Sequence, residues 1–195
     1  MPNLTSLRLA LEQPSITLDL PKASRAAVAA VFTQDLDLLF IERAKHRGDP
    51  WSGHISFPGG KAETQDQTLL GTAIRETHEE LGLQLNGAEV LGWLDEITTV
   101  SGLPSMVVRP WVFVVDDFGT LQPNEEVAAV HRVPLAQLLA DVDRGTFVFD
   151  YKGQNVTLAK VSFPGEAFLW GMTLRMLDQL LDRIDGRGIG LARLR

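Results

Sequence analysis

The hydrophobic residues of this chain recur first with one period and then with another, and each change of period marks a new element. The stretch from Leu4 to Leu11 has a helical pattern. Two apolar runs follow, Ala26 to Phe32 and Leu36 to Glu42, separated by the turn residues Thr33-Gln34-Asp35. We therefore expect a short helix followed by a β-hairpin.

The clearest helical pattern extends from about Asp66 to Leu81. Thr64-Gln65-Asp66-Gln67 fits a capping box at its start, and Gly82 stands where a left-handed residue would end the helix. One side of the helical wheel is apolar or small, and we expect it to face the core. This side holds Leu70, Ala73, Ile74, Thr77 and Leu81.

The rest of the chain continues the mixture of strands and helices. The expected elements, in chain order, are two long strands (Glu89 to Thr99 and Met106 to Val115, joined through Ser101-Gly102-Leu103-Pro104), a short helix (Pro134 to Leu139), a hairpin (Phe147 to Tyr151 and Val156 to Val161, across Lys152-Gly153-Gln154) and an amphipathic helix (Glu166 to Ile184). This order predicts a mixed α/β fold with helices packed on a sheet.

Three carboxylates on the expected central helix are the first sign of chemistry. Glu76, Glu79 and Glu80 are spaced i, i+3, i+4, so they share one flank, which we expect to differ from the apolar side. Like charges at this spacing repel each other by a few tenths of a kcal/mol per pair. A divalent cation would reverse that repulsion, and hard oxygen ligands suit Mg²⁺ or Mn²⁺.

A glycine loop precedes this helix. Phe57-Pro58-Gly59-Gly60 ends an apolar run, and its two glycines allow the backbone to approach a ligand closely. A strand, a glycine loop and an acidic helix together predict a site for phosphate and metal.

These residues resemble the Nudix hydrolase family. Its box, G-x5-E-x7-R-E-U-x-E-E-x-G-U with U a bulky apolar residue, is matched in its second half by Arg75-Glu76-Thr77-His78-Glu79-Glu80-Leu81-Gly82-Leu83, with Thr77 in place of the aliphatic residue. The first half has one inserted residue, and Glu63, Asp66 and Gln67 are the candidates for its glutamate.

Within the family, the chain looks most like the coenzyme A pyrophosphatase branch. That branch has an upstream pattern, L-L-T-x-R-[SA]-x3-R-x3-G-x3-F-P-G-G, of which Leu39, Arg43, Ala44, Gly53 and Phe57-Pro58-Gly59-Gly60 are present. Phe40 and Ile41 replace Leu and Thr, and the second arginine is displaced to Arg47. Trp170-Gly171-Met172-Thr173 resembles the carboxyl-terminal helix of the branch.

The resemblance implies a Nudix α/β/α sandwich and assigns roles within it. The metal ligands would be Glu76, Glu79 and Glu80, with a carbonyl of Gly59 or Gly60. Arg75 would hold Glu79 in place. Glu79 and Glu80 would be catalytic residues. The general base would be a glutamate of the box, such as Glu79, or it would be Glu126 on a later loop. Arg43, Arg47 and Lys61 would contact the substrate phosphates, beside Gly59 and Gly60.

The activity implied is metal-dependent hydrolysis of a pyrophosphate bond, with coenzyme A or a related nucleoside diphosphate derivative as the small-molecule substrate. Two other functions stay open. One is hydrolysis of ADP-ribose, sugar nucleotides or nucleoside triphosphates, which the displaced Arg47 favours. The other is a noncatalytic nucleotide sensor, against which the complete set of three glutamates argues. Many members of the family form dimers, so a homodimer is the oligomer that the resemblance suggests.

Composition narrows the class of protein. The chain has 195 residues, 45% of them hydrophobic, and neither a linker nor a repeat divides it, so residues 1–195 are expected to form one domain. The net charge of -7 argues against a general nucleic-acid binder. No apolar run approaches the ~18 residues that span a bilayer, and the amino terminus has no signal pattern. The absence of Cys excludes disulfides and is compatible with a reducing compartment, so we expect a cytoplasmic protein without a membrane partner.

Four other residues attract attention but have simpler interpretations. His54 and His78 lack the spacing of zinc ligands, so we expect them to be structural or exposed. Trp51 and Trp170 are expected to pack against the protein, with stacking on a nucleobase as the alternative.

Overall fold

The computed structural model describes residues 2–45, 52–99, 105–140, 142–151, 153–164 and 167–185. In these residues a large mixed sheet has the strand order β3-β2-β1-β7-β5, with β4 paired to β1, β6 to β7 and β8 to β2. Its strands are β1 (Ser24–Thr33), β2 (Asp37–Arg43), β3 (Ile55–Ser56), β4 (Gly59–Lys61), β5 (Glu89–Trp93), β6 (Ile97–Thr98), β7 (Met106–Val115) and β8 (Val127–Pro134).

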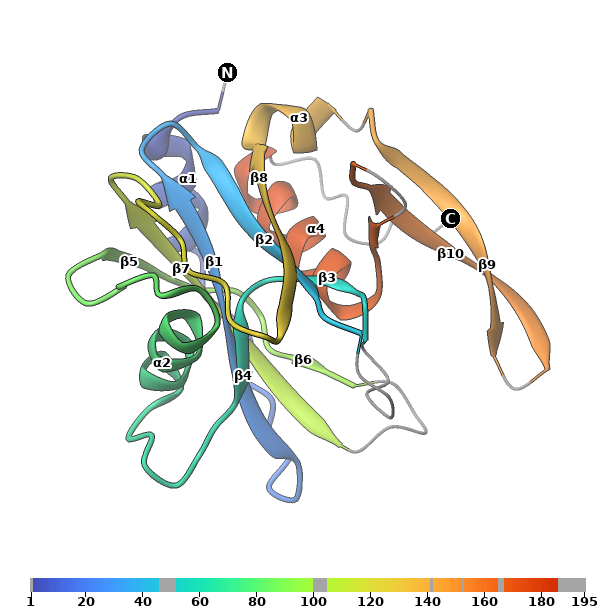
Figure 1. Cartoon of the computed structure of the whole chain (residues 1–195), viewed down its shortest axis with the longest axis horizontal. Helices are drawn as coiled ribbons and strands as arrows, with labels where there is room; N and C mark the ends of the chain where they lie inside the picture. The colour runs from blue at the N-terminus through green and yellow to red at the C-terminus, as the bar shows by residue number, and fades with distance from the viewer. Residues whose placement is uncertain are drawn as a thin grey trace.

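A smaller sheet and the helices complete the described fold. The sheet has the order β11-β10-β9. In Figure 1 its hairpin projects from the body of the molecule on the right. Its strands are β9 (Arg144–Tyr151), β10 (Gln154–Ser162) and β11 (Phe168–Leu169), and the helices are α1 (Leu4–Leu11), α2 (Leu69–Leu81), α3 (Leu135–Ala140) and α4 (Gly171–Asp185).

The central strand β1 is buried on both faces. Ala27, Ala29 and Val31 belong to the core beneath α2, whereas Ala26 and Phe32 belong to the core beneath α1 and α4. A strand covered on both sides has no solvent face, which explains why its sequence is almost continuously apolar. The parallel pairing of β1 with β7 runs from Ser24 and Met106 at one end to Thr33 and Val115 at the other. The predicted α/β/α sandwich is confirmed.

Most of the predicted elements are present, and the differences have local causes. The helix α2 begins at Leu69 rather than near Asp66, because Thr68 is the N-cap and accepts the Gly71 N–H at 3.0 Å. The prediction of a capping box at residues 64–67 is therefore wrong. The prediction that Gly82 ends the helix is confirmed, with φ +66°.

Two further predictions of continuous elements are wrong. Residues 89–99 form two strands, because Asp95 and Glu96 between them accept the backbone N–H groups of Ile16 at 2.9 Å and Leu18 at 2.7 Å. The last helix begins at Gly171, since Phe168–Leu169 pairs with β10. The strand β8 was not predicted. Its burial pattern is irregular because it lies along β2 at the border of the sheet.

Parts of other predictions lie outside the described residues. These are Trp51, the connection at residues 101–104, Lys152 in the β9–β10 turn, and Glu166. Among the helices that the structure describes, none is both long enough and apolar enough to cross a membrane.

Candidate active site

Two glycines in β4 allow the backbone to lie directly against the sheet and the acidic helix. Gly59 has φ +145°, and a Cβ there would stand 2.4 Å from the carbonyl oxygen of Ala27. A Cβ on Gly60 would stand 2.5 Å from the carboxyl carbon of Glu76. Both distances are too short for non-bonded atoms, so a side chain at either position would displace the strand or the carboxylate. The Glu76 carboxylate therefore lies against bare backbone.

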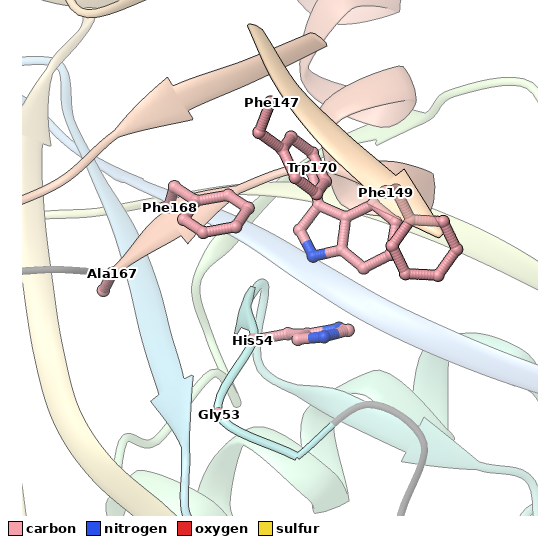
Figure 2. Close-up of a pocket in the computed structure, with 7 residues that line it drawn as sticks. All are labelled: Gly53, His54, Phe147, Phe149, Ala167, Phe168 and Trp170. Carbon is pink, nitrogen blue, oxygen red and sulfur yellow. The ribbon is translucent and has the colours of Figure 1, made fainter. Parts of the chain in front are cut away.

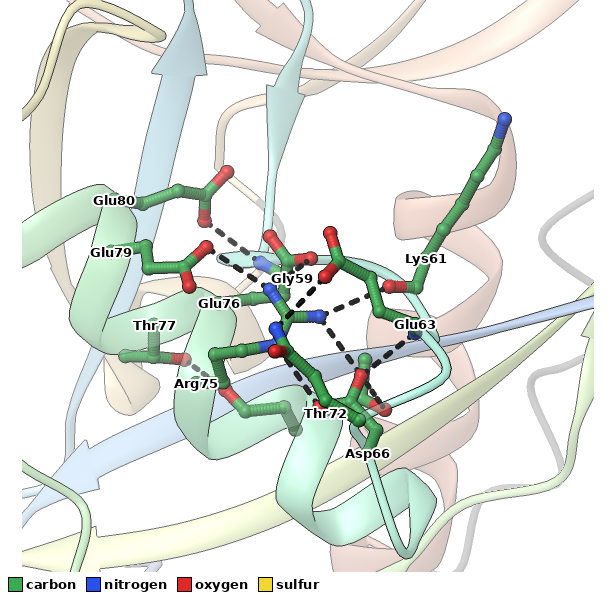
Figure 3. Close-up of polar contacts among 12 residues, drawn as sticks. Gly59, Lys61, Glu63, Asp66, Thr72, Arg75, Glu76, Thr77, Glu79 and Glu80 are labelled. Atoms are coloured by element: carbon green, nitrogen blue, oxygen red, sulfur yellow. Dashed lines mark hydrogen bonds and ion pairs between the residues drawn. The ribbon is translucent and has the colours of Figure 1, made fainter.

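Glu80 is the buried carboxylate of the site. It is 3% exposed, and it accepts a hydrogen bond from the Gly59 N–H at 2.8 Å (Figure 3). Burial is the largest cause that raises the pKa of this carboxyl to about 8, and the negative charges of Glu76 and Glu126 act in the same direction. The Gly59 hydrogen bond and the positive charge of Arg43 oppose them. Further positive charge would therefore favour its ionised form at neutral pH.

The prediction that all three glutamates lie on one flank away from the core is wrong for Glu80. This residue is buried together with Thr77 and Leu81, whereas the Glu79 side chain is 54% exposed and that of Glu76 is 17% exposed. The helical wheel places Glu80 at the edge of the apolar side. Its burial depends on β4, which supplies the N–H group that the carboxylate needs.

Arg75 holds the acidic residues around it in place. Its guanidinium donates two hydrogen bonds to Asp66, at 3.0 and 2.9 Å, and lies 3.0 Å from both Glu76 and Glu79. It also donates to the carbonyl oxygen of Lys61 at 3.2 Å, which ties the helix to β4 (Figure 3). The hydrogen bonds to Asp66 are the largest cause that raises the pKa of Arg75 above its ordinary value. Arg75 therefore neutralises part of the cluster and fixes its geometry.

Glu63, Asp66 and Gln67 were the candidates for the glutamate in the first half of the box, and Asp66 is the one of them that contacts the site. Its side chain is 6% exposed and accepts hydrogen bonds from the Glu63 N–H at 2.9 Å and the Thr72 hydroxyl at 3.0 Å. The hydrogen bonds from Arg75 hold the pKa of Asp66 well below its usual range. Glu63 and Gln67, the other two candidates, are exposed. Glu63 also bonds to the Gln65 side chain at 2.9 Å.

The other predicted site residues lie at different distances from the carboxylates. Glu126 begins the approach to β8, and its carbonyl oxygen accepts the Ala44 N–H at 2.7 Å. The negative charge of Glu126 raises the pKa of Glu80, and the positive charge of Arg43 lowers it. The Lys61 side chain is exposed and extends away from the glutamates (Figure 3). Arg47 lies outside the described residues.

The oxygen ligands fit a divalent cation in kind and in charge. Glu76 and Glu80 are hard carboxylate donors, and burial is the largest cause that raises the pKa of each, so the pair favours a cation beside it. Among the described residues, no group of three or more His, Asp or Glu is already gathered to hold a metal ion. The Glu79 carboxylate is directed to Arg75 instead. Glu76 and Glu80, the two less exposed of the three glutamates, are therefore the residues that best fit a metal, and Glu79 would have to leave Arg75 to join them.

An aromatic pocket lies on the other side of β3 from the acidic helix. Its volume is about 250 Å³, and Gly53 and Ala167 are the two residues of its lining that have no ring (Figure 2). His54 was predicted to be structural or exposed, and Trp170 to pack against the protein with nucleobase stacking as the alternative, without a contact between the two. The alternation of Phe147 and Phe149 along one face of a strand was the available signal. The rings of the pocket are His54, Phe147, Phe149, Phe168 and Trp170.

Comparison with known proteins agrees with this architecture. The model of the NUDIX domain family matches residues 23–167. An uncharacterized Nudix hydrolase, NudL, of Yersinia enterocolitica is 31% identical over 181 residues, which cover 91% of this chain and 90% of the relative. The NudL of Salmonella heidelberg is 32% identical over 182 residues and 89% of each chain. These relatives support the family without identifying the coenzyme A branch.

A solved structure shows the same fold. The MutT protein from Methanosarcina mazei superimposes with a TM-score of 0.51 and 18% identity, over 63% of this chain and 85% of that one. The region that the family model matches begins just before β1, and it contains β4, α2 and the Arg75 cluster. The chain therefore belongs to the Nudix family and is a Nudix hydrolase, an enzyme of the pyrophosphatase type.

Proposed function

We propose that this enzyme is a metal-dependent pyrophosphohydrolase that cleaves the diphosphate of coenzyme A into 3',5'-ADP and 4'-phosphopantetheine. The observation that carries the hydrolytic part is the buried Glu80 carboxylate bound to the Gly59 N–H, with Glu76 beside it over Gly60. Two carboxylates held against bare backbone suit a cation and a phosphate together. A pure nucleotide sensor would gain nothing from burying such a group.

Mg²⁺ or Mn²⁺ would be held by Glu76 and Glu80, with Glu79 and the Gly59 carbonyl as further ligands. When bound, the metal would neutralise the charge of the diphosphate oxygens and promote attack by water. Arg75 ties α2 to Asp66 and to the Lys61 carbonyl, which would hold Glu76 and Glu80 in position, whereas Glu79 would have to leave Arg75.

The chain supplies the proton acceptor and the phosphate contacts. A water oxygen would form a bond to phosphorus, the bond from phosphorus to the bridging oxygen would break, and Glu126 would accept the proton of the water. Glu126 is favoured over Glu79 because Glu79 is paired with Arg75, whereas Glu126 is exposed and its charge acts on both Glu76 and Glu80. Arg43 is proposed to contact a phosphate of the substrate. Lys61 and Arg47 are proposed for the outer phosphate groups.

Coenzyme A is proposed because the residues from Leu39 to Gly60 resemble the pattern of the coenzyme A branch. A second candidate is hydrolysis of ADP-ribose, a sugar nucleotide or a nucleoside triphosphate. The displacement of the second arginine of the pattern to Arg47 favours it.

Substrate assays decide between the two candidates. Coenzyme A, ADP-ribose, NADH, sugar nucleotides and nucleoside triphosphates would be compared with Mg²⁺ and with Mn²⁺, and kcat/KM is expected to be highest for coenzyme A. If kcat/KM is higher for ADP-ribose or a sugar nucleotide, that compound replaces coenzyme A as the proposed substrate. Arg47→Ala provides a second measurement, because a loss limited to substrates with a 3'-phosphate would assign Arg47 to that group.

A further inference from the structure

The aromatic pocket is built from three separate parts of the chain that meet at Trp170. The indole ring of Trp170 lies 5.2 Å from Phe147, 5.1 Å from Phe149 and 4.9 Å from His54, measured between ring centroids. Phe168 joins the cluster through Phe147 at 4.8 Å. At these distances the rings contact one another, and together they line a pocket (Figure 2). The pocket is therefore a concave aromatic surface.

The pocket is adjacent to the acidic site. The His54 carbonyl oxygen accepts the Arg43 N–H at 3.0 Å, and the next residue, Ala44, donates to the Glu126 carbonyl at 2.7 Å. The backbone of Arg43 thus contacts a wall of the pocket, and its positive charge favours the ionised form of Glu80. His54 also precedes Gly59 by only five residues, which span at most ~18 Å when fully extended. One extended nucleotide could therefore reach from the pocket to the carboxylates.

The size and lining of the pocket select one kind of ligand group. Its volume of about 250 Å³ is below the ~300–1,000 Å³ of pockets that hold drug-sized ligands. It therefore suits a single ring system and not a whole dinucleotide. The walls consist mainly of aromatic rings, and an aromatic ring can stack on any planar base. A phosphate would lose its hydration there without compensation.

We propose that the aromatic pocket binds the nucleobase of the substrate, and that Arg43 lies between this base and the diphosphate held at Glu76 and Glu80. This inference rests on the proposed function for the nature of the substrate. It makes the β9–β10 hairpin a part of substrate recognition, since that hairpin supplies Phe147 and Phe149.

The test compares two ligands that differ by the base. Binding of AMP and of ribose 5-phosphate to the metal-free protein would be measured by isothermal titration calorimetry. Wild type is expected to bind AMP at least ~10-fold more tightly. Phe149→Ala should reduce this ratio to below ~3-fold, and Phe149→Tyr should keep it because a ring remains. Val148→Ala is the matched control, since Val148 lies on the opposite face of β9 and is 64% exposed.

Activity gives a second readout. With a substrate that the wild type cleaves, Phe149→Ala should raise KM at least ~5-fold and change kcat little, as expected for loss of uniform binding. Phe168→Leu should have the same effect on AMP binding if Phe149→Ala does not fold.

Several outcomes would overturn the inference. One is an AMP preference below ~3-fold in wild type. Another is a preference that stays unchanged in folded Phe149→Ala and Phe168→Leu. A third is that these variants lose affinity for 4'-phosphopantetheine and keep their affinity for AMP. Failure of the proposed function is distinguishable, because absence of hydrolysis would leave the AMP measurement intact. Glu80→Gln should likewise retain the AMP preference.

Discussion

Glu80 shows how one buried side chain links the fold to the chemistry. The residue is buried beside Leu81, yet it must ionise to serve as a ligand. Desolvation opposes ionisation and raises its pKa to about 8. The Gly59 N–H offsets part of that cost at 2.8 Å, and a cation would offset more.

Glu80→Gln is expected to fold normally and to lose at least ~100-fold in kcat. Gln is neutral and its carbonyl oxygen can accept the same Gly59 hydrogen bond, but it is a poor ligand for a divalent cation. Steady-state kinetics at saturating Mg²⁺ and circular dichroism measure the two effects. Near-normal turnover would contradict the assignment of Glu80 as a metal ligand.

The proton acceptor can be identified by comparing two carboxylates. Glu126→Gln is expected to lower kcat strongly, leave metal affinity almost unchanged, and remove the acidic limb of the pH-rate profile, because the neutral side chain cannot accept a proton. Glu79→Gln is the comparison. If Glu126→Gln behaves like wild type and Glu79→Gln loses that limb, the base belongs to α2.

At the level of elements, the connection between β4 and α2 is fastened by side chains. Asp66 accepts hydrogen bonds from Arg75, Thr72 and the backbone of Glu63. Its carboxylate therefore does not cap the first turn of a helix that begins at Asp66. This explains why α2 starts at Leu69. The capping-box pattern of residues 64–67 predicted an earlier start, but Thr68 is the N-cap and the Asp66 carboxylate accepts other hydrogen bonds.

Asp66→Asn tests this fastening. At pH 7 the free energy of unfolding is expected to fall by about 1–3 kcal/mol, because a charged hydrogen-bonded pair is lost. The pKa of Asp66 is lowered in the folded state, so its stabilisation is present above the unfolded value of about 3.9 and declines as pH falls below it. Urea unfolding of both proteins at pH 7 and pH 3 measures this. A difference that grows toward acid pH would contradict the role of the ion pair.

Across the whole molecule, the sheet has one face for each core, and the site lies on the face beneath α2. The Arg8 and Glu89 side chains join α1 to β5 at 2.8 Å. Arg144 and Asp178 likewise join β9 to α4. The homodimer and the cytoplasmic location stay predictions.

Metal is expected to stabilise the whole fold, and the effect should depend on Glu80. Its pKa of about 8 exceeds the ordinary value of 4.5, so the folded protein binds more protons than the unfolded chain between these values. The metal-free protein should therefore lose stability as pH rises through this range, less so in Glu80→Gln.

At pH 8, Mg²⁺ or Mn²⁺ at 100 times Kd should raise the Tm of wild type by about 5–10 °C and that of Glu80→Gln much less. Differential scanning calorimetry with and without EDTA measures both shifts. Equal shifts in the two proteins would place the metal elsewhere.

The sequence alone determined the features that depend on neighbouring residues. Periodicity and turn residues predicted the β1–β2 and β9–β10 hairpins, and Gly82 predicted the end of α2. The spacing of Arg75, Glu76, Glu79 and Glu80 was enough for the family. These signals are local because helices and strands repeat over a few residues.

The tertiary structure decided the features that join distant segments. The burial of Glu80, the pairing of Arg75 with Asp66, the breaking of residues 89–99 into two strands and the aromatic pocket all depend on such contacts. No local period records which backbone N–H will face a carboxylate, or which rings will meet from residues 54, 147 and 170. Those contacts form only when the sheet brings the segments together, and hydrogen bonding and desolvation then set the chemistry of the site.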